Sequence, residues 1–117
     1  MRASSYDTVL QRGENVIAVK ATDAGGFAGF IAALEWSGGS AVSDGSWKVS
    51  TVEQAGWNLP GFNDSGWANA LAYGAYGTSP WHTEVAGFPS GAGAQWIWSA
   101  DNDADNLVYF RYRIVVR

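Results

Sequence analysis

The 117-residue sequence contains no cysteine, a single histidine and three prolines, and only 15% of its residues are charged. The absence of cysteine excludes a disulfide framework, a thiol nucleophile and thiolate metal sites. One histidine cannot assemble a multi-histidine metal centre. The G-x-S-x-G nucleophile motif is also absent. Because no catalytic constellation is evident, we expect the chain not to be an enzyme.

Positive charge is scarce and scattered as well. Seven lysines and arginines stand against eleven acidic residues, which gives a formal net charge of −4 and a pI near 4.6. Surfaces that track phosphates normally carry clustered positive charge, so nucleic acid is not an expected partner. No apolar run approaches the roughly eighteen residues of a membrane span. The first residues, MRASSYDTVLQ, lack the apolar core of a signal peptide, so we expect no membrane partner and no export signal.

Apolar, aromatic and glycine residues dominate what is present. Hydrophobic residues make up 47% of the chain and aromatic residues 15%, and the length predicts a single domain over residues 1–117. No stretch keeps a helical period, whereas short β-branched or alternating runs are separated by glycine, proline, asparagine and aspartate. The pattern predicts an all-β fold, an antiparallel β-sandwich or jelly roll of roughly seven or eight strands.

The predicted strands can be placed along the chain. Asn15–Thr22 is β-branched and is followed, through a tight glycine turn, by an expected antiparallel partner over Gly29–Trp36. The Gly/Ser-rich segment 37–46 is predicted to be a flexible connection. Further strands are expected at Trp47–Val52, Ala94–Trp98 and Leu107–Val116, and Ala68–Ala75 is either a strand or an irregular crossing.

Three segments resemble the galactose-binding-like jelly-roll modules of bacterial proteins, a type of carbohydrate-binding module. GENVIAVKATDAGGFAGFIAALEW is similar to their closing strands, GFNDSGWANA to their opening, and QWIW with VYFRYRIVV to the strand pair that follows the opening. The closing strands come first here and the opening strands last, and the family's middle section is missing. This order is either a circular permutation, with a joint at 37–46, or a reading frame that spans the end of one module and the start of the next. The resemblance implies a jelly roll that binds carbohydrate, belongs to an exported protein and, as in many such modules, holds a structural calcium.

The missing middle section predicts unpaired strand edges, Leu107–Val116 among them. Exposed apolar edges recruit other chains. We therefore expect a homo-oligomer, with strand exchange between copies. The same feature defines the alternative function, a structural or protein-interaction module that oligomerises through its strand edges and binds no sugar.

The seven tryptophans differ in their surroundings, and five of them lie in or beside predicted strands. Four of these five are expected in the core, because a buried indole contributes the largest apolar area of any side chain. Trp36 ends a predicted strand and is expected to be half exposed. The four core candidates are Trp47, Trp67, Trp96 and Trp98.

Other aromatic residues lie among polar neighbours and are candidates for ligand binding. A loop aromatic ring can stack on the apolar face of a sugar while nearby amides and carboxylates bind its hydroxyls. The alternative is that these rings cap the ends of the sandwich, and His82 next to Trp81 is open to both interpretations. The candidate ligand-binding residues are Trp57, Tyr73, Tyr76, Trp81 and His82.

The acidic residues supply two further hypotheses. Asp101, Asp103 and Asp105 alternate as the first ligands of a calcium loop do, although Asn106 and Tyr112 stand where an EF-hand needs glycine and glutamate. A solvated hairpin loop is the favoured interpretation, and calcium, in a structural role, is the one candidate cofactor. Glu35 is predicted to be buried in an apolar strand, but one carboxylate is not a glycosidase mechanism.

Overall fold

The computed structural model describes residues 10–22, 29–36, 38–75, 93–101, 105 and 107–116. These residues form antiparallel strands, so the all-β prediction and the antiparallel prediction are confirmed. Within the same residues, no helix has the length and hydropathy needed to cross a membrane. The strands are β1 (Gly13–Thr22), β2 (Ala33–Trp36), β3 (Gly39–Val42), β4 (Lys48–Ser50), β5 (Ala68–Asn69), β6 (Leu71–Ala75), β7 (Gln95–Trp98) and β8 (Leu107–Val116).

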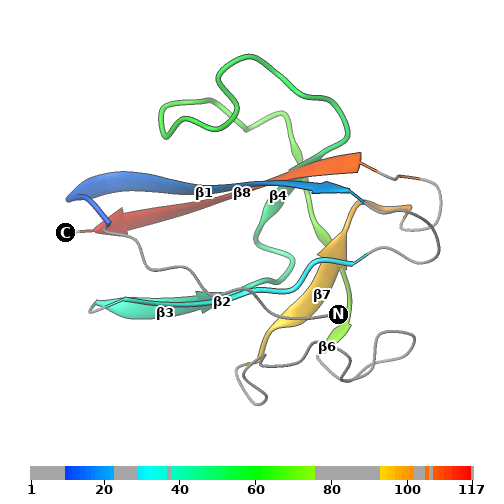
Figure 1. Cartoon of the computed structure of the whole chain (residues 1–117), viewed down its shortest axis with the longest axis horizontal. Helices are drawn as coiled ribbons and strands as arrows, with labels where there is room; N and C mark the ends of the chain where they lie inside the picture. The colour runs from blue at the N-terminus through cyan, green and yellow to red at the C-terminus, as the bar shows by residue number, and fades with distance from the viewer. Residues whose placement is uncertain are drawn as a thin grey trace.

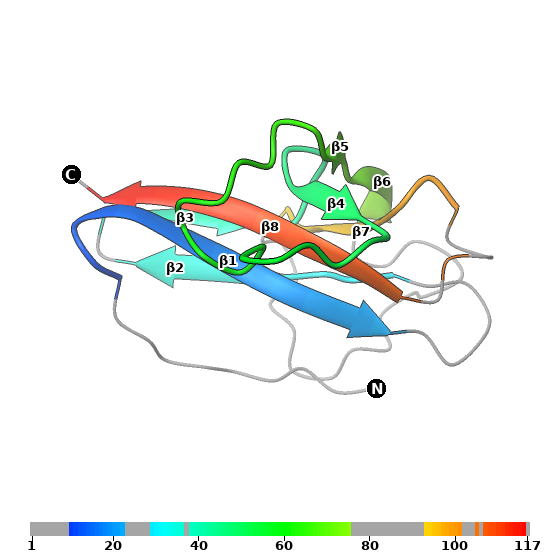
Figure 2. The same cartoon turned by 90° about the horizontal axis from the view of Figure 1, so that it is seen from above.

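The largest sheet has four strands in the order β1-β8-β4-β5. β1 and β8 pair over ten residues, from Gly13 opposite Val116 to Thr22 opposite Leu107 (Figures 1 and 2). β4 pairs with the other side of β8. The expectation that Leu107–Val116 forms an unpaired edge is therefore wrong, because β1 folds back onto β8 and leaves it inside the sheet.

Two hairpins lie below this sheet in Figure 1, β2 with β3 and β6 with β7. The expected pairing of Gly29–Trp36 with the first strand is wrong, because Phe30 forms an isolated bridge with Ile97 of β7 and β2 begins only at Ala33. The segment 37–46 is not simply a flexible connection, since it contains β3. At Gly39 a Cβ atom would lie 3.2 Å from the Trp36 ring, so glycine lets the indole close over the turn.

The core lies between the four-stranded sheet and the hairpins. Phe110 of β8 stacks on Phe30 at 5.3 Å between ring centroids and meets Trp98 edge-on at 5.8 Å. The Trp98 and Trp47 indole nitrogens donate to the backbone oxygens of Asp105 (2.8 Å) and Val42 (2.9 Å), which satisfies these polar groups away from water. All four tryptophans predicted in the core are buried, but Trp67 is buried on the opposite face of the four-stranded sheet, against Trp57 and Phe62. Trp36 is half-buried as expected.

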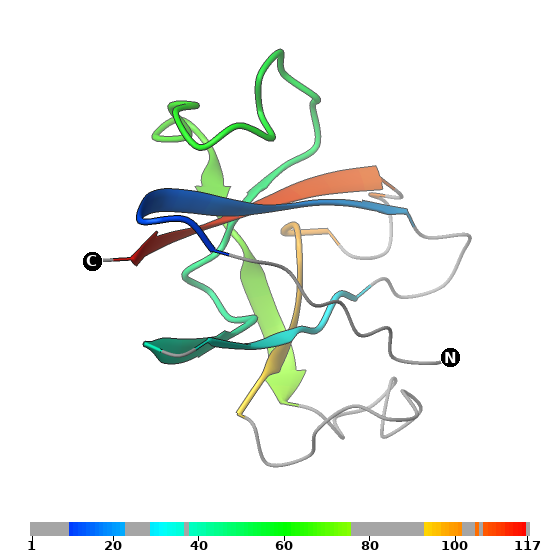
Figure 3. The ribbon, with the colours of Figure 1, turned by 60° about the vertical axis from the view of Figure 1, so that its left-hand side comes forward.

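The residues of β1 and β8 alternate between two faces of the sheet. Ile17 and Val19 pack on the core from β1, and Val108 and Phe110 do so from β8, as the alternation predicts. The opposite face is covered by the segment between β4 and β5, residues 51–67, which we call the covering loop. Figures 1 and 3 show it rising on the side of the sheet away from the hairpins.

Candidate functional site

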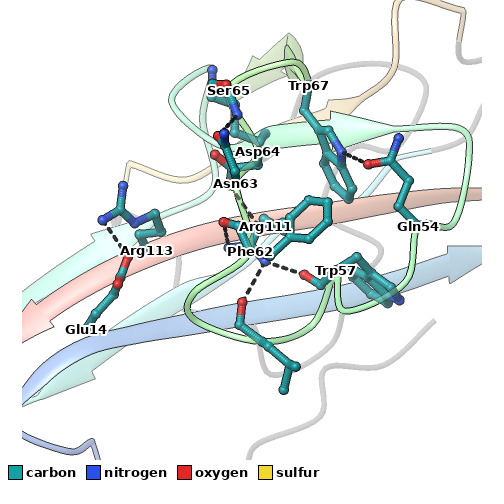
Figure 4. Close-up of polar contacts among 12 residues, drawn as sticks. Glu14, Gln54, Trp57, Phe62, Asn63, Asp64, Ser65, Trp67, Arg111 and Arg113 are labelled. Atoms are coloured by element: carbon teal, nitrogen blue, oxygen red, sulfur yellow. Dashed lines mark hydrogen bonds and ion pairs between the residues drawn. The ribbon is translucent and has the colours of Figure 1, made fainter.

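The covering loop is held on the sheet by Arg111, whose side chain is completely buried. Its Nε donates to Asp64 Oδ2 at 2.8 Å, and its Nη1 donates to the backbone oxygens of Leu59 (3.1 Å) and Trp57. Its Nη2 donates to the Phe62 oxygen at 3.4 Å, and the guanidinium lies 5.0 Å from the Phe62 ring centre (Figure 4). A buried charge is tolerated only when it is paired and hydrogen-bonded, and this network satisfies both conditions.

Four aromatic rings meet between the loop and the sheet, and we call them the aromatic cluster: Trp57, Phe62, Trp67 and Tyr109. Trp57 stacks on Trp67 with 6.4 Å between ring centroids and meets Tyr109 edge-on at 5.0 Å. Phe62 contacts Trp67 edge-on at 5.8 Å. Trp67 is buried, whereas Trp57 is only half-buried, so part of the Trp57 side chain faces solvent with the other rings behind it.

Polar groups complete this surface. Gln54 Oε1 accepts a hydrogen bond from Trp67 Nε1 at 3.2 Å, and the Gln54 side chain is itself exposed. Asn58 is exposed next to Trp57, and Leu59 exposes 58% of its surface. The candidate binding surface therefore combines a partly exposed indole with two exposed amides and one exposed aliphatic side chain from the same stretch of the covering loop: Gln54, Trp57, Asn58 and Leu59.

Tyr109 anchors the loop at a second point. Its hydroxyl donates to Glu53 Oε1 at 3.1 Å, and its side chain is buried. Burial raises the pKa of Tyr109 above its usual value of 10.0, and the hydrogen bond to Glu53 and the negative charge of that carboxylate raise it further. The phenol therefore remains protonated at neutral pH and keeps its donor role.

The structure separates two of the predicted ligand-binding residues. Trp57 lies in the covering loop, as expected, but Tyr73 belongs to β6 rather than to a loop. Tyr73 packs on the core, on the other side of the four-stranded sheet, and its hydroxyl donates to the Ser99 oxygen at 2.6 Å. Tyr73 therefore does not contribute to the surface around Trp57. The remaining candidates, Tyr76, Trp81 and His82, lie outside the described residues.

The predicted calcium loop lies only partly within the described residues. Asp105 Oδ2 accepts a hydrogen bond from Ser99 Oγ at 2.5 Å, and the Asp105 amide donates to the Asp101 backbone oxygen at 3.1 Å. Asp103 lies outside the described residues. In the part of the chain that the structure describes, no three His, Cys, Asp or Glu side chains gather as metal ligands would. Glu35, predicted to be buried, is exposed on β2.

Sequence reasoning missed the residues that hold the loop. Arg111 and Asp64 are 47 positions apart in the chain, so no local pattern connects them. One signal was available in YFRYR, where the alternation places Tyr109 and Arg111 on the face opposite the core. A tyrosine and an arginine on that face, inside an apolar strand, indicate that something polar covers it.

Comparison with known proteins gives one partial similarity. A segment of this chain is 43% identical, over 78 aligned residues, to part of an alpha-L-rhamnosidase from Streptomyces avermitilis. The alignment covers 62% of this chain and only 8% of that enzyme, so the chain corresponds to a small part of a much longer protein. No protein-family model matches the chain, and no solved structure matches it. The chain thus resembles part of a bacterial carbohydrate-active enzyme.

Proposed function

We propose that the chain is a non-catalytic carbohydrate-binding module of the galactose-binding-like, jelly-roll type, and that Trp57 is its sugar platform. The observation that carries the proposal is the partly exposed Trp57 ring, which contacts Trp67 and Tyr109 and lies in a loop segment that exposes the amides of Gln54 and Asn58. The partial similarity to an alpha-L-rhamnosidase supports carbohydrate as the ligand class. Fold likeness alone would be a weaker reason, because one fold serves many functions.

The chemistry of such a site follows from its residues. The apolar face of a pyranose stacks on the Trp57 indole, and the amides of Gln54 and Asn58 supply donors and acceptors for its hydroxyls. Arg111 does not touch the sugar. It holds the Trp57 and Leu59 carbonyls from below, so that the platform is ordered before the ligand arrives and loses less entropy on binding.

The test is calorimetric titration with L-rhamnose and with rhamnose-terminated oligosaccharides, followed by a glycan array. Trp57→Ala should weaken binding by at least about tenfold, because a stacked aromatic ring contributes on the order of 1–3 kcal/mol by analogy with base stacking. Trp36→Ala is the matched control, since it removes another half-buried tryptophan from a different sheet. Equal affinity of Trp57→Ala and the parent chain would refute the assigned platform.

Two additional arms test the candidate sites that lie wholly or partly outside the described residues. Trp81→Ala tests the second predicted platform, together with its neighbour His82. Titrations with calcium and with EDTA test the proposed cofactor, and a loss of binding in EDTA would make Asp101, Asp103 and Asp105 the residues to mutate. If the folded protein binds no glycan in any arm, the chain is an interaction module instead.

A further inference from the structure

The outer edge of β1 is the longest strand edge that no described residue pairs with. β1 lies at one end of the β1-β8-β4-β5 order, and β8 pairs with its inner side over all ten residues (Figure 2). Natural edge strands are usually short, interrupted by proline or protected by a central charge. β1 has ten residues, contains no proline, and carries no charge from Asn15 to Val19. As far as the described residues show, its edge therefore lacks the usual protection against pairing with another strand.

The charges of β1 lie only near its two ends. Glu14 and Lys20 are both exposed, and Ile17 lies midway between them. Because they are an even number of residues apart, Glu14 and Lys20 are on the same face of the strand, together with Val16 and Ala18. Along this face of β1, an acidic side chain is therefore followed by two apolar side chains and then by a basic one.

We propose that two copies of the chain associate through β1, antiparallel, about a two-fold axis at Ile17. In this register Glu14 of each copy lies opposite Lys20 of the other, and Val16 lies opposite Ala18. In an antiparallel ladder, directly opposite residues form either a hydrogen-bonded pair or a non-hydrogen-bonded pair. A two-fold axis can pass through either kind of pair, so this register is possible whether or not the backbone N–H and C=O of Ile17 point toward the partner. The two four-stranded sheets become one continuous sheet across the interface.

The order of the charges along β1 favours a second copy of the chain as the partner, and it favours antiparallel over parallel pairing. A two-fold interface must be self-complementary, and a strand with opposite charges equally far from its centre has that property. Parallel pairing would set Glu14 against Glu14 and Lys20 against Lys20, which is unfavourable. Glu14 also forms an ion pair with Arg113 of β8 at 2.5 Å (Figure 4), so each interface end becomes a row of three alternating charges.

The experiment measures the dimer dissociation constant by sedimentation equilibrium over a range of concentrations. Glu14→Lys and Lys20→Glu, each alone, replace two opposite-charge pairs with two like-charge pairs. Each variant should raise the dissociation constant by roughly tenfold or more, since opposed charges across strands contribute a few tenths to one kcal/mol per pair. An equimolar mixture of the two variants should form heterodimers with affinity close to that of the parent, because every opposed pair is then of opposite sign.

The matched control is Glu35→Lys, which makes the same charge change at an exposed position of β2. It should leave the dissociation constant unchanged, and circular dichroism should show that all variants are folded. A parent chain that remains monomeric at every concentration overturns the proposal. A dimer that neither β1 variant weakens, or a mixture that does not recover affinity, also overturns it. None of these outcomes depends on sugar binding.

Discussion

The two faces of the four-stranded sheet are stabilised in different ways. The inner face is apolar and packs on rings and aliphatic chains from all three sheets, so its stabilisation is spread over many contacts. The outer face is covered by a loop without strands, and its contacts converge on Arg111 and Tyr109. The comparison indicates that the inner face determines whether the chain folds, whereas the outer face determines the shape of the candidate binding surface.

The largest expected effect belongs to the inner face. Phe110 is fully buried between Phe30 and Trp98, so Phe110→Ala removes a ring and leaves a cavity. We expect it to lower the free energy of unfolding by about 4 kcal/mol. Urea denaturation should show one transition at lower urea, with the loop and the sheet lost together. A change below about 1 kcal/mol would show that Phe110 is not part of the cooperative core.

A smaller effect, confined to the outer face, is expected from Asp64→Ala. The substitution leaves the buried Arg111 guanidinium without its carboxylate partner, and breaking such a pair costs about 3 kcal/mol. Hydrogen exchange should accelerate at the amides that form the loop turns, those of Trp57 and Leu59, more than at the amides of β1. Uniform acceleration in both regions would contradict the division between the faces.

A double-substitution cycle sharpens this result. Arg111→Met removes the buried charge together with its need for a partner, while an aliphatic chain of similar length remains. The variant with both Asp64→Ala and Arg111→Met should therefore be less destabilised than the sum of the single substitutions. Additive losses would mean that the two residues stabilise the loop independently.

The inner face was also the part that could be predicted from the sequence. The run LVYFRYRIVV predicted the bounds of β8, Leu107–Val116, and the structure shows that Val108 and Phe110, two residues apart, both pack on the core. Strand partners could not be predicted in the same way, because pairing depends on residues far apart in the chain. β8 was therefore expected at an edge although it lies inside the sheet, and β2 was assigned to β1 although it pairs with β3.

The candidate site was predictable only through single residues. Trp57 could be selected because an indole among turn residues is unusual, but the support beneath it comes from β8, more than fifty positions away. Tyr73 looked similar in the sequence, yet its side chain packs on the core, where the Ser99 backbone oxygen accepts a hydrogen bond from its hydroxyl. A loop aromatic and a strand aromatic differ in function because of the face they occupy, and a short sequence window does not contain that information.

The smallest expected effect concerns Tyr109 and the pH dependence of stability. Because burial and Glu53 raise the pKa of Tyr109 in the folded chain, the unfolded chain loses this proton at lower pH than the folded one. The contribution to the free energy of unfolding is therefore fully present below about pH 10, the pKa of an exposed tyrosine, and is lost as the pH rises through the folded pKa. Urea denaturation between pH 8 and pH 11 should show this decline in the parent chain.

Tyr109→Phe should remove that part of the decline and cost little at pH 8, because the ring and its contact with Trp57 remain. Glu53→Gln keeps a hydrogen-bond acceptor but removes the negative charge, so it should lower the folded pKa of Tyr109 and make the decline shallower. Absorbance near 295 nm follows phenolate formation directly. If the stability of Tyr109→Phe declines as steeply as that of the parent, the alkaline loss of stability originates outside the Tyr109–Glu53 pair.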